Sequence, residues 1–576
     1  MKITVARTAG FCMGVRRAVE MVLDTPGKYG DPIYTFGPLI HNPQVLELLS
    51  EKGIETLTEV PDHGEGTILI RAHGVPPETK EKLAQAGFTV LDATCPRVIR
   101  VQVIIKKHTR KGYTTIIIGN KDHPEVVGLQ GYAGEHGFVV ANIKELKALP
   151  AFDKAIIVAQ TTQNQRLYGE ITQWADTHHG HYKVFNTICH STSLRQTEVQ
   201  RLAQTSDAIV VVGGSESGNT RRLVEIARES GKPAFQIESE ADLDLTNFET
   251  FHRASITAGA STPNWVLKRV FRTLEKVSIT KGRALHRAYF TIRRALLLTN
   301  IYVALGAGSL CFACAELQNL SDHFSTVLVA MLYVFSMHIL NNLIGGKADR
   351  FNDPGRAHFY RKYKFPLMSL AMAAGSYGLI TAATMGVLPF LVLLAMSLLG
   401  LAYKLPLLPR KISGGRYRSI RDIPGSKTIL IAIAWGVATA VFPALVRGNG
   451  ISLATIVVFF WSTALVFVRT AFFDILDTQG DRIVGRETIP LLFGEQATTR
   501  FLKLILIILP LILIFSAAIS LVTSLAVALT VSPIFLFLVI AFHQEGHMLP
   551  GIRLEFFVES GFILAGLITL IWVVAN

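Results

Sequence analysis

The sequence of 576 residues predicts an N-terminal α/β domain with three pseudo-repeated α/β lobes, followed by a C-terminal all-α, polytopic membrane domain with about nine transmembrane helices. Up to about Lys276, short apolar runs alternate with polar turns and helical patterns, as in α/β units. From about Ala295 to Asn576 the apolar stretches reach roughly twenty residues, the length that spans a bilayer as a helix. We therefore divide the chain into residues 1–276, a basic juxtamembrane linker at 277–294, and residues 295–576.

The N-terminal domain contains recurrent strand candidates, each followed by a polar or glycine-rich turn: Thr67–Ile70, Thr114–Ile118, Ala155–Val158 and Ala208–Val212. One cysteine lies in each section of this pattern, at Cys12, Cys95 and Cys189. We expect three lobes around a shared centre, each donating one thiolate. Five cysteines in a cytosolic setting argue against a disulfide framework and favour metal or redox chemistry.

Three thiolates without a fourth cysteine partner indicate an iron–sulfur cluster in which one iron has no protein ligand, because such clusters normally take four protein sulfurs. The central cluster of this domain would then keep one iron open for a substrate. Cys311 and Cys314 also form a C-x-x-C pair, but they lie in the first apolar stretch among small residues. We interpret that pair as helix packing rather than as a redox centre.

Three histidines follow apolar stretches and lie near Gly or Pro: His41, His73 and His123. Each alone is more often a surface or satisfied core residue. Together they are stronger evidence, because open α/β sheets bind ligands outside the carboxyl ends of their strands. Two further loops, Gly213–Thr220 and Ala258–Pro263, combine glycine with hydroxyl residues as anion-binding loops do. The combination predicts a compact, highly charged ligand such as a diphosphate.

The same domain contains, in order, AGFCMGV, GPLIHN, RAHGV, DATCP, HPEV, QTT, NTIC, SGNT and AGAS. On these motifs, residues 1 to about 275 closely resemble the LytB-type family of 4-hydroxy-3-methylbut-2-enyl diphosphate reductases. The resemblance implies that Cys12, Cys95 and Cys189 hold a [4Fe–4S] cluster. It implies that Glu125 delivers protons and that Thr161 orders the substrate's hydroxyl. The implied substrate-binding set is His41, His73, His123, Thr161, Ser217, Gly218, Asn219 and Ser261.

The resemblance also implies the reaction, which is the last step of the methylerythritol phosphate route to isoprenoids. An allylic diphosphate alcohol is reduced to isopentenyl and dimethylallyl diphosphate, with electrons from a donor such as ferredoxin or flavodoxin. Departures from the family pattern are small. Gly218 stands where many relatives carry a second serine, which removes one hydrogen bond to the diphosphate, and His190-Ser191 after Cys189 is unusual.

The membrane domain has nine apolar stretches, centred near Ala304, Val334, Ala373, Leu394, Ala434, Phe460, Ile512, Phe535 and Ile568. Basic residues concentrate in the segments from Lys347 to Lys364 and from Lys404 to Lys427. By the positive-inside rule we expect a multi-pass inner (cytoplasmic) membrane protein whose N-terminal catalytic domain faces the cytoplasm. The net charge of +14 is largely juxtamembrane, so it favours anionic lipid and not nucleic acid as a partner.

The sixth apolar stretch ends in Asp474, Asp477 and Asp481, which share one helical face. Carboxylates so placed suit Mg²⁺ bridging to a diphosphate, and the alternative is a solvated charge cluster in a loop. With the nine stretches, this D-x-x-D-x-x-G-D pattern resembles the intramembrane UbiA superfamily of polyprenyl transferases. Tyr403, Pro406 and Lys427 also match that family's cytoplasmic cap.

The first aspartate motif of the UbiA pattern is degenerate here, because Asn342 and Asp349 stand in a segment that otherwise carries glycine and lysine. Asn342 offers an amide oxygen, so a first Mg²⁺ site would be weakened, and prenyl transfer either survives with altered metal use or is lost. Two alternatives to the reductase reading stay open at this point. The chain is a redox or isoprenoid sensor without catalysis, or a polyprenyl transferase whose reductase half supplies substrate.

Overall fold

The computed structural model describes residues 1–30, 32–280, 284–320, 323–345, 349–403, 419–420, 423–447, 450–484, 487–545 and 551–576. The chain forms two compact units, Met1–Lys281 and Gly282–Asn576, which are described separately below. The segments around Pro406 and Lys347, named in the sequence analysis, lie outside the described residues.

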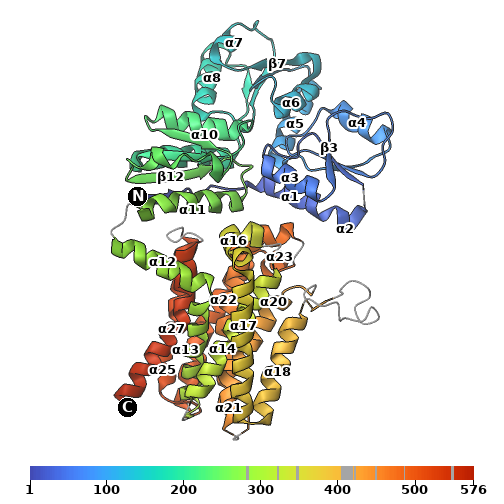
Figure 1. Cartoon of the computed structure of the whole chain (residues 1–576). Coiled ribbons are helices and arrows are strands. Elements are labelled where there is room, and N and C mark those ends of the chain that lie inside the picture. The colour runs from blue at the N-terminus through green and yellow to red at the C-terminus, as the bar shows by residue number, and fades with distance from the viewer. Residues whose placement is uncertain are drawn as a thin grey trace. The chain divides into compact units, whose positions relative to one another are not determined.

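The first unit contains three parallel sheets of four strands each. Figure 1 labels one strand of each sheet: β12, β3 and β7. The first sheet has the order β1 (Lys2–Val5), β12 (Arg253–Ala258), β10 (Ala208–Val212), β11 (Ala234–Ile237). The second has the order β3 (Ile54–Leu57), β2 (Ile33–Phe36), β4 (Thr67–Ile70), β5 (Thr89–Asp92). The third has the order β7 (Gly137–Val140), β6 (Thr114–Ile118), β8 (Ala155–Ala159), β9 (Lys183–Val184).

Helices connect the parallel strands, as such sheets require. They are α1 (Met13–Asp24), α2 (Pro26–Tyr29), α3 (Pro43–Glu51), α4 (Pro77–Gln85), α5 (Pro96–Thr109), α6 (Pro124–Ala133), α7 (Ile143–Lys147), α8 (Gln165–His178), α9 (His190–Thr205), α10 (Gly218–Glu229) and α11 (Asn264–Thr280), with short 3₁₀ turns at Gly134–His136, Glu240–Asp242 and Leu245–Phe248. Every residue of β4, β8 and β10 is buried, because helices cover both sheet faces.

The three-lobed α/β prediction is confirmed. Each sheet contributes one of the predicted cysteines, since Cys12 follows β1, Cys95 follows β5 and Cys189 follows β9. The strand register also explains how distant loops meet. Val212 at the end of β10 lies opposite Ala258 at the end of β12, so the two glycine–serine loops leave the same sheet edge together.

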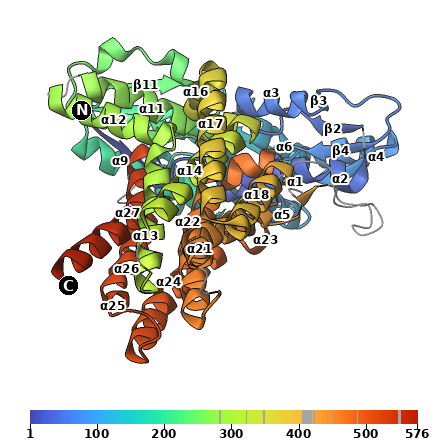
Figure 2. The ribbon, with the colours of Figure 1, turned by 60° about the horizontal axis from the view of Figure 1, so that its bottom comes forward.

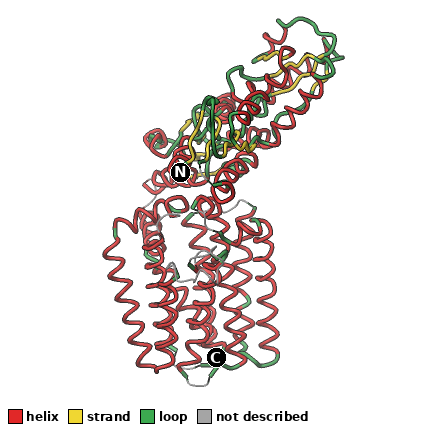
Figure 3. The backbone as a smooth tube through the Cα atoms, turned by 90° about the vertical axis from the view of Figure 1, so that its right-hand side faces the viewer, coloured by secondary structure: helices red, strands yellow, loops and turns green. Residues whose placement is uncertain are grey.

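The described part of the second unit is helical and contains no strand, as Figure 3 shows. Its helices are α12 (Ala284–Leu298), α13 (Ile301–Leu317), α14 (Phe324–Gly345), α15 (Asp349–Asn352), α16 (Pro354–Lys362), α17 (Lys364–Met385), α18 (Val387–Ala402), α20 (Ser426–Gly436), a π-helical turn (Val437–Val441), α21 (Phe442–Val446), α22 (Leu453–Ile483), α23 (Ile489–Phe493), α24 (Glu495–Ala518), α25 (Leu525–Leu529), α26 (Val531–Gln544) and α27 (Ile552–Ala575). Helix α13 packs against both α14 and α27, as seen in Figure 2.

All nine predicted apolar centres lie in these helices. Within the described residues, seven helical segments are long and apolar enough to cross a membrane, and an eighth is counted if a bent pair forms one span. That pair is Ala288–Leu298 with Ile301–Leu317, bent by 72°. The remaining stretch, Val387–Ala402, is a shorter apolar helix.

The bend lies where the sequence predicts the start of the first span. Asn300 adopts a left-handed conformation, with φ of 59°, which an asparagine tolerates better than most residues. Its buried side-chain amide donates a hydrogen bond to the hydroxyl of Tyr360 at 2.5 Å. The described part of the predicted linker is itself helical, because α12 begins at Ala284.

Candidate functional site

The three predicted cysteines share one local structure, because each is the N-cap residue of a long helix. Cys12 precedes α1, Cys95 precedes α5 and Cys189 precedes α9. The backbone N–H of Val15 donates to Sγ of Cys12 at 3.5 Å. Helix N-termini carry partial positive charge, which suits an anionic or metal-bound group held at these positions.

The cysteines also lie near one another. Burial raises the pKa of the Cys95 thiol, and the negative charges of Cys12 and Cys189 raise it further. Among the described residues, however, the one set of three side chains close enough to share a single ion is a histidine set and not this cysteine set. The cysteine arrangement therefore fits a group that contains several metal atoms better than it fits one ion.

Gly14 lies in the first turn of α1, against Cys95. A Cβ atom added there would overlap Sγ of Cys95 and stand 3.1 Å from its Cβ. We predict that Gly14→Ala displaces Cys95 and lowers the iron content of anaerobically reconstituted protein several-fold. Iron and sulfide assays check this, with Gly169→Ala as the control, because no atom lies within 4 Å of a Cβ at Gly169. Full metal loading of Gly14→Ala would contradict the prediction.

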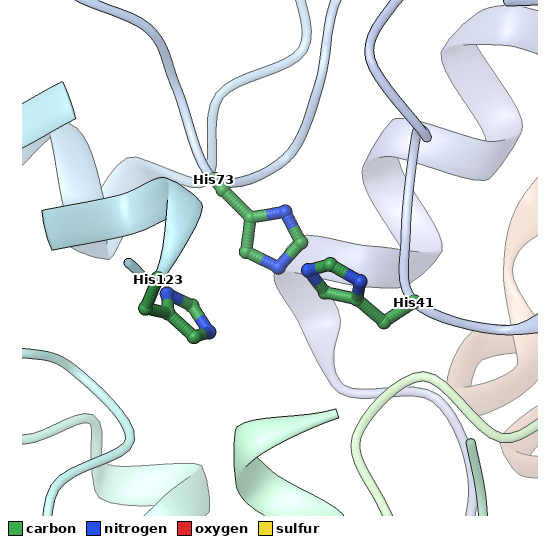
Figure 4. Close-up of side chains that lie close together, drawn as sticks. All are labelled: His41, His73 and His123. Carbon is green, nitrogen blue, oxygen red and sulfur yellow. The ribbon is translucent and has the colours of Figure 1, made fainter. Parts of the chain in front are cut away.

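The three predicted histidines form a tight group, shown in Figure 4. Their ligand atoms lie within 4.8 Å of one another, and the ring centroids of His41 and His73 are 4.6 Å apart. His41 and His73 follow β2 and β4, which pair in parallel with Phe36 opposite Ile70. His123 follows β6 and is the N-cap residue of α6. The grouping thus follows from the carboxyl ends of strands, as predicted from the sequence.

Hydrogen bonding decides between a metal and an anion as the ligand of this histidine trio. Nδ1 of His123 accepts a hydrogen bond from the backbone N–H of Glu125 at 3.1 Å. The neutral ring must then carry its proton on Nε2, which makes Nε2 a donor with no free lone pair for a metal. A donor at this position suits an anion.

The three histidines are neutral before any ligand binds. Burial lowers the pKa of His41, and the charge of Arg71 lowers it further. Burial also lowers the pKa of His123 to about 4, and the pKa of His73 falls well below its usual value for the same reason, aided by the other two rings. A bound diphosphate would reverse this effect, because negative charge favours the protonated imidazole.

The two glycine–serine loops stand beside the trio. Ser261 Oγ donates to the backbone carbonyl of His41 at 3.0 Å, and Ser217 is the N-cap residue of α10. Several buried polar atoms here have no hydrogen-bond partner in the described chain: His41 Nε2, His73 Nδ1, and both Asn219 Nδ2 and Asn219 Oδ1. Buried polar groups are nearly always paired, so these atoms mark a place for a polar ligand.

Gly218 is the departure from the family pattern, and the structure has room for a side chain there. A Cβ at this position would stand 3.4 Å from Nε2 of His123 and 3.8 Å from Nε2 of Gln160, which is ordinary contact. We predict that Gly218→Ser adds a donor to the anion site and strengthens diphosphate binding several-fold, by about 1 kcal/mol. Calorimetry with inorganic diphosphate measures this, and weaker binding would contradict it.

Glu125 is buried and held by one residue. The backbone N–H of Thr161 donates to one carboxylate oxygen at 2.7 Å, and the Thr161 hydroxyl donates to the other at 2.9 Å. Burial raises the pKa of Glu125 to about 7, although both hydrogen bonds from Thr161 act in the opposite direction. A carboxyl group with this pKa is close to half protonated at neutral pH and can donate a proton.

Backbone hydrogen bonds join the cysteine loops to the ligand loops, which sequence reasoning did not foresee. The N–H of Cys189 donates to the carbonyl of Thr161 at 2.9 Å. The N–H groups of Cys95 and Cys12 donate to the carbonyls of Ala72 and Ala260, at 2.9 and 3.0 Å. These acceptors are Thr161 itself and the neighbours of His73 and Ser261. The loops that carry the predicted metal ligands are therefore hydrogen-bonded to the loops that carry the predicted anion ligands.

In the second unit, two of the predicted carboxylates are buried at the end of α22. Asp474 accepts a hydrogen bond from the Thr428 hydroxyl and lies 3.4 Å from Nζ of Lys427. Asp481 accepts a hydrogen bond from Nδ2 of Asn352 at 3.1 Å.

Asp477, in contrast, is only half-buried. The degenerate first motif ends at the start of α15, which begins at Asp349 and packs against α22. Asn342 lies in the last turn of α14 and is also half-buried. Asn352, at the end of α15, is the residue of this segment whose side chain contacts Asp481.

The fold and site together define a three-lobed α/β protein with a cysteine trio and a histidine trio, joined to a unit of long apolar helices. Residues 3–275 match the family model described as LytB protein, and residues 300–548 match the UbiA prenyltransferase family. The 4-hydroxy-3-methylbut-2-enyl diphosphate reductase of Geotalea daltonii is 40% identical over 283 residues, which cover 49% of this chain and all of that protein. The reductase of the same name from Aquifex aeolicus is 39% identical over 287 residues, covering 48% and 96%.

Solved structures match each half in turn. The E-1-hydroxy-2-methyl-but-2-enyl-4-diphosphate reductase from Plasmodium falciparum is 28% identical, with a TM-score of 0.45, and covers 50% of this chain and 89% of that one. A UbiA homolog from Archaeoglobus fulgidus, bound to GPP and Mg²⁺, is 17% identical, with a TM-score of 0.35, and covers 48% and 98%.

The chain belongs to the LytB family through its N-terminal half, and its C-terminal half is a UbiA prenyltransferase family domain. With its apolar helices, this domain makes the chain a multi-pass membrane protein. Both resemblances seen in the sequence are confirmed.

Proposed function

We propose that the N-terminal unit reduces 4-hydroxy-3-methylbut-2-enyl diphosphate to isopentenyl and dimethylallyl diphosphate. One observation carries the proposal: Glu125 and Thr161 connect the predicted metal ligands to the predicted anion site. Thr161 is tied to Cys189 through its carbonyl and to Glu125 through its N–H and hydroxyl, and Glu125 donates its own N–H to His123. The names of the relatives supply the substrate class.

The cysteine trio fits an iron–sulfur cluster. Three cysteines at helix N-termini converge from three lobes, too widely for one ion but suited to a [4Fe–4S] group held by Cys12, Cys95 and Cys189. When bound, this group supplies electrons and one open, Lewis-acidic iron. The electrons come in turn from a carrier protein such as ferredoxin or flavodoxin.

The protein side chains bind the substrate and supply protons. The histidine trio, Ser217 and Asn219 donate hydrogen bonds to the diphosphate, together with the backbone N–H groups around Gly218 at the N-terminus of α10. Ser261 joins them when its hydroxyl turns from the carbonyl of His41 to the ligand. In its protonated state Glu125 donates to Thr161 Oγ1, which frees the threonine O–H for the substrate's hydroxyl. Two electrons and two protons are consumed overall: the allylic C–O bond breaks, its oxygen leaves as water, and a new C–H bond forms at either end of the allyl system.

The test uses the full chain in detergent, reconstituted anaerobically and assayed with chemically reduced ferredoxin or flavodoxin. We expect cluster-level iron and sulfide and formation of both C5 products. Separate Cys12→Ser, Cys95→Ser and Cys189→Ser variants should lose both cluster and turnover, whereas the control Cys314→Ala, in a buried cysteine of the membrane unit, should keep them. A loaded protein that binds diphosphate without turning over substrate would favour the sensor instead.

For the membrane unit we propose prenyl transfer in the inner membrane, with the N-terminal unit on the cytoplasmic side. The supporting observation is the burial of Asp474 and Asp481, because carboxylates at membrane level are costly unless they function. Asp474, Asp477, Asp481, Asn342 and Asp349 are the oxygen ligands that we propose for Mg²⁺, which would have to draw them together when it binds. Diphosphate release from geranyl diphosphate and an acceptor should require Mg²⁺ and fall at least tenfold in Asp481→Asn. Release that is absent in the wild type would mean that the domain is remodelled and only anchors the reductase.

A further inference from the structure

Two charged side chains on α9 hold the loop that carries Cys12. We call this pair, Arg195 and Glu198, the α9 clamp; both residues are buried, with exposed fractions of 3% and 9%. They lie one helical turn apart on the helix that begins directly after Cys189.

Glu198 holds the start of the Cys12 loop through three hydrogen bonds. One carboxylate oxygen accepts the backbone N–H of Arg7 at 2.8 Å. The other accepts the N–H of Thr8 at 2.9 Å and its hydroxyl at 2.6 Å. The anchored residues, Arg7 and Thr8, therefore lie five and four positions before Cys12.

Arg195 holds the end of the same loop. Its Nη2 donates to the carbonyl of Gly10 at 2.7 Å, and its Nη1 donates to the carbonyl of Ala258 at 3.0 Å. Gly10 has a φ of 109°, and an added Cβ would overlap the Asn264 side chain, so this part of the loop has little freedom. Nε of Arg195 is buried without a hydrogen-bond partner in the described chain.

The charge of Arg195 requires an explanation, because its hydrogen bonds go to neutral carbonyls and a buried charge is costly without a partner. The anionic groups that act on it are Cys12, Glu198 and Cys189. Two of these three are predicted cluster ligands from different lobes. Removing the guanidinium would therefore leave those thiolates without their buried cation.

We propose that Arg195 is a positioning residue for the cluster, which holds the Cys12 loop against the Cys189 helix and, by its charge, raises the reduction potential of the bound group. This inference rests on the proposed function. A nearby positive charge favours the reduced, more negative form of a redox centre. The reductase would then accept electrons from its donor more readily.

The test compares wild type, Arg195→Gln and Arg195→Lys as full chains in detergent, reconstituted anaerobically. Potentiometric titration followed by electron paramagnetic resonance gives the midpoint potential. For Arg195→Gln we expect a reduction equilibrium constant on the order of tenfold smaller, which is a shift of about 59 mV to more negative potential for one electron. Arg195→Lys keeps the positive charge but does not reproduce the two guanidinium hydrogen bonds to the backbone carbonyls. Its midpoint potential should therefore stay near the wild-type value, whereas an iron chelator should remove its cluster several-fold faster.

Arg166→Gln is the control, since it removes the same charge from a largely exposed side chain whose ion pair, with Glu170, lies outside the α9 clamp. Its potential and its cluster lifetime should be unchanged. Equal potentials and equal chelator rates in all variants would overturn the inference while leaving the proposed function intact. If Arg195→Gln does not fold, the chelator rate of Arg195→Lys decides, and a wild-type rate there overturns the inference. A wild type that takes up no cluster refutes the proposed function instead.

Discussion

Glu125→Gln is expected to lower turnover by about 10²–10⁴-fold, the usual range for removing a general acid. Glutamine preserves the contacts with Thr161, because its carbonyl accepts the Thr161 N–H and its amide faces the Thr161 hydroxyl. The loss would therefore report the missing proton. Anaerobic assays of C5 product formation measure it, alongside the iron content, which should be unchanged.

The same substitution should change how stability depends on pH. Because burial raises the pKa of Glu125 to about 7, the folded state holds a proton that the unfolded state releases near its ordinary pKa of 4.5. Stability contributed by this group is thus complete below the unfolded pKa and is lost as pH rises through the folded one. At about pH 8 the variant should be more stable than the wild type, by an amount on the order of 3 kcal/mol.

Thermal unfolding of the full chain in detergent from about pH 5 to pH 8 measures this difference. Glu170→Gln is the control, since Glu170 is half-exposed and pairs only at the surface with Arg166. A Glu125→Gln variant with wild-type turnover would remove Glu125 from the mechanism. Wild-type pH dependence of unfolding would contradict the raised pKa.

Diphosphate binding is expected to weaken steeply as pH rises, because the histidine trio must take up protons to match the ligand's charge. In the free protein the pKa values of His41, His73 and His123 are lowered, so the rings are neutral near pH 7. Each proton taken up on binding makes affinity fall tenfold per pH unit. Two such protons would change affinity by about a hundredfold per unit.

Calorimetry with inorganic diphosphate in buffers of different ionisation enthalpy counts these protons. The difference between wild type and His41→Asn cancels the titration of diphosphate itself, and the variant should take up fewer protons. His136→Gln, at an exposed position, should match the wild type. Binding without any difference in proton uptake would show that the rings stay neutral in the complex.

Much of this fold was predictable because its signals are local. Buried parallel strands such as Ala208–Val212 are continuous apolar runs, and each ligand loop directly follows one. The membrane helices are equally direct, since their length and hydropathy are set by the bilayer. The break at Asn300 was not predictable, because the apolar composition continues across it and one left-handed residue produces the bend.

The site was predictable where chemistry is concentrated in a residue type, as with Cys95 or His123. Arg195 was missed because an arginine inside a helix usually faces solvent, and only the tertiary contacts to Gly10 and Ala258 reveal its burial. The contact of Asn352 with Asp481 was not predictable for a similar reason, since the two residues are 129 positions apart. The backbone hydrogen bonds from the cysteines to the ligand loops were not predictable, because a backbone N–H or carbonyl is present whatever the residue type.

Those three backbone bonds have a physiological consequence. Cys12, Cys95 and Cys189 each donate a backbone hydrogen bond to a loop of the proposed diphosphate site. Substrate binding should therefore stabilise the cluster-loaded form of the protein by mass action. A bound cluster should in turn raise the affinity for the substrate. Under the proposed function, saturating substrate would slow the loss of the cluster to oxygen.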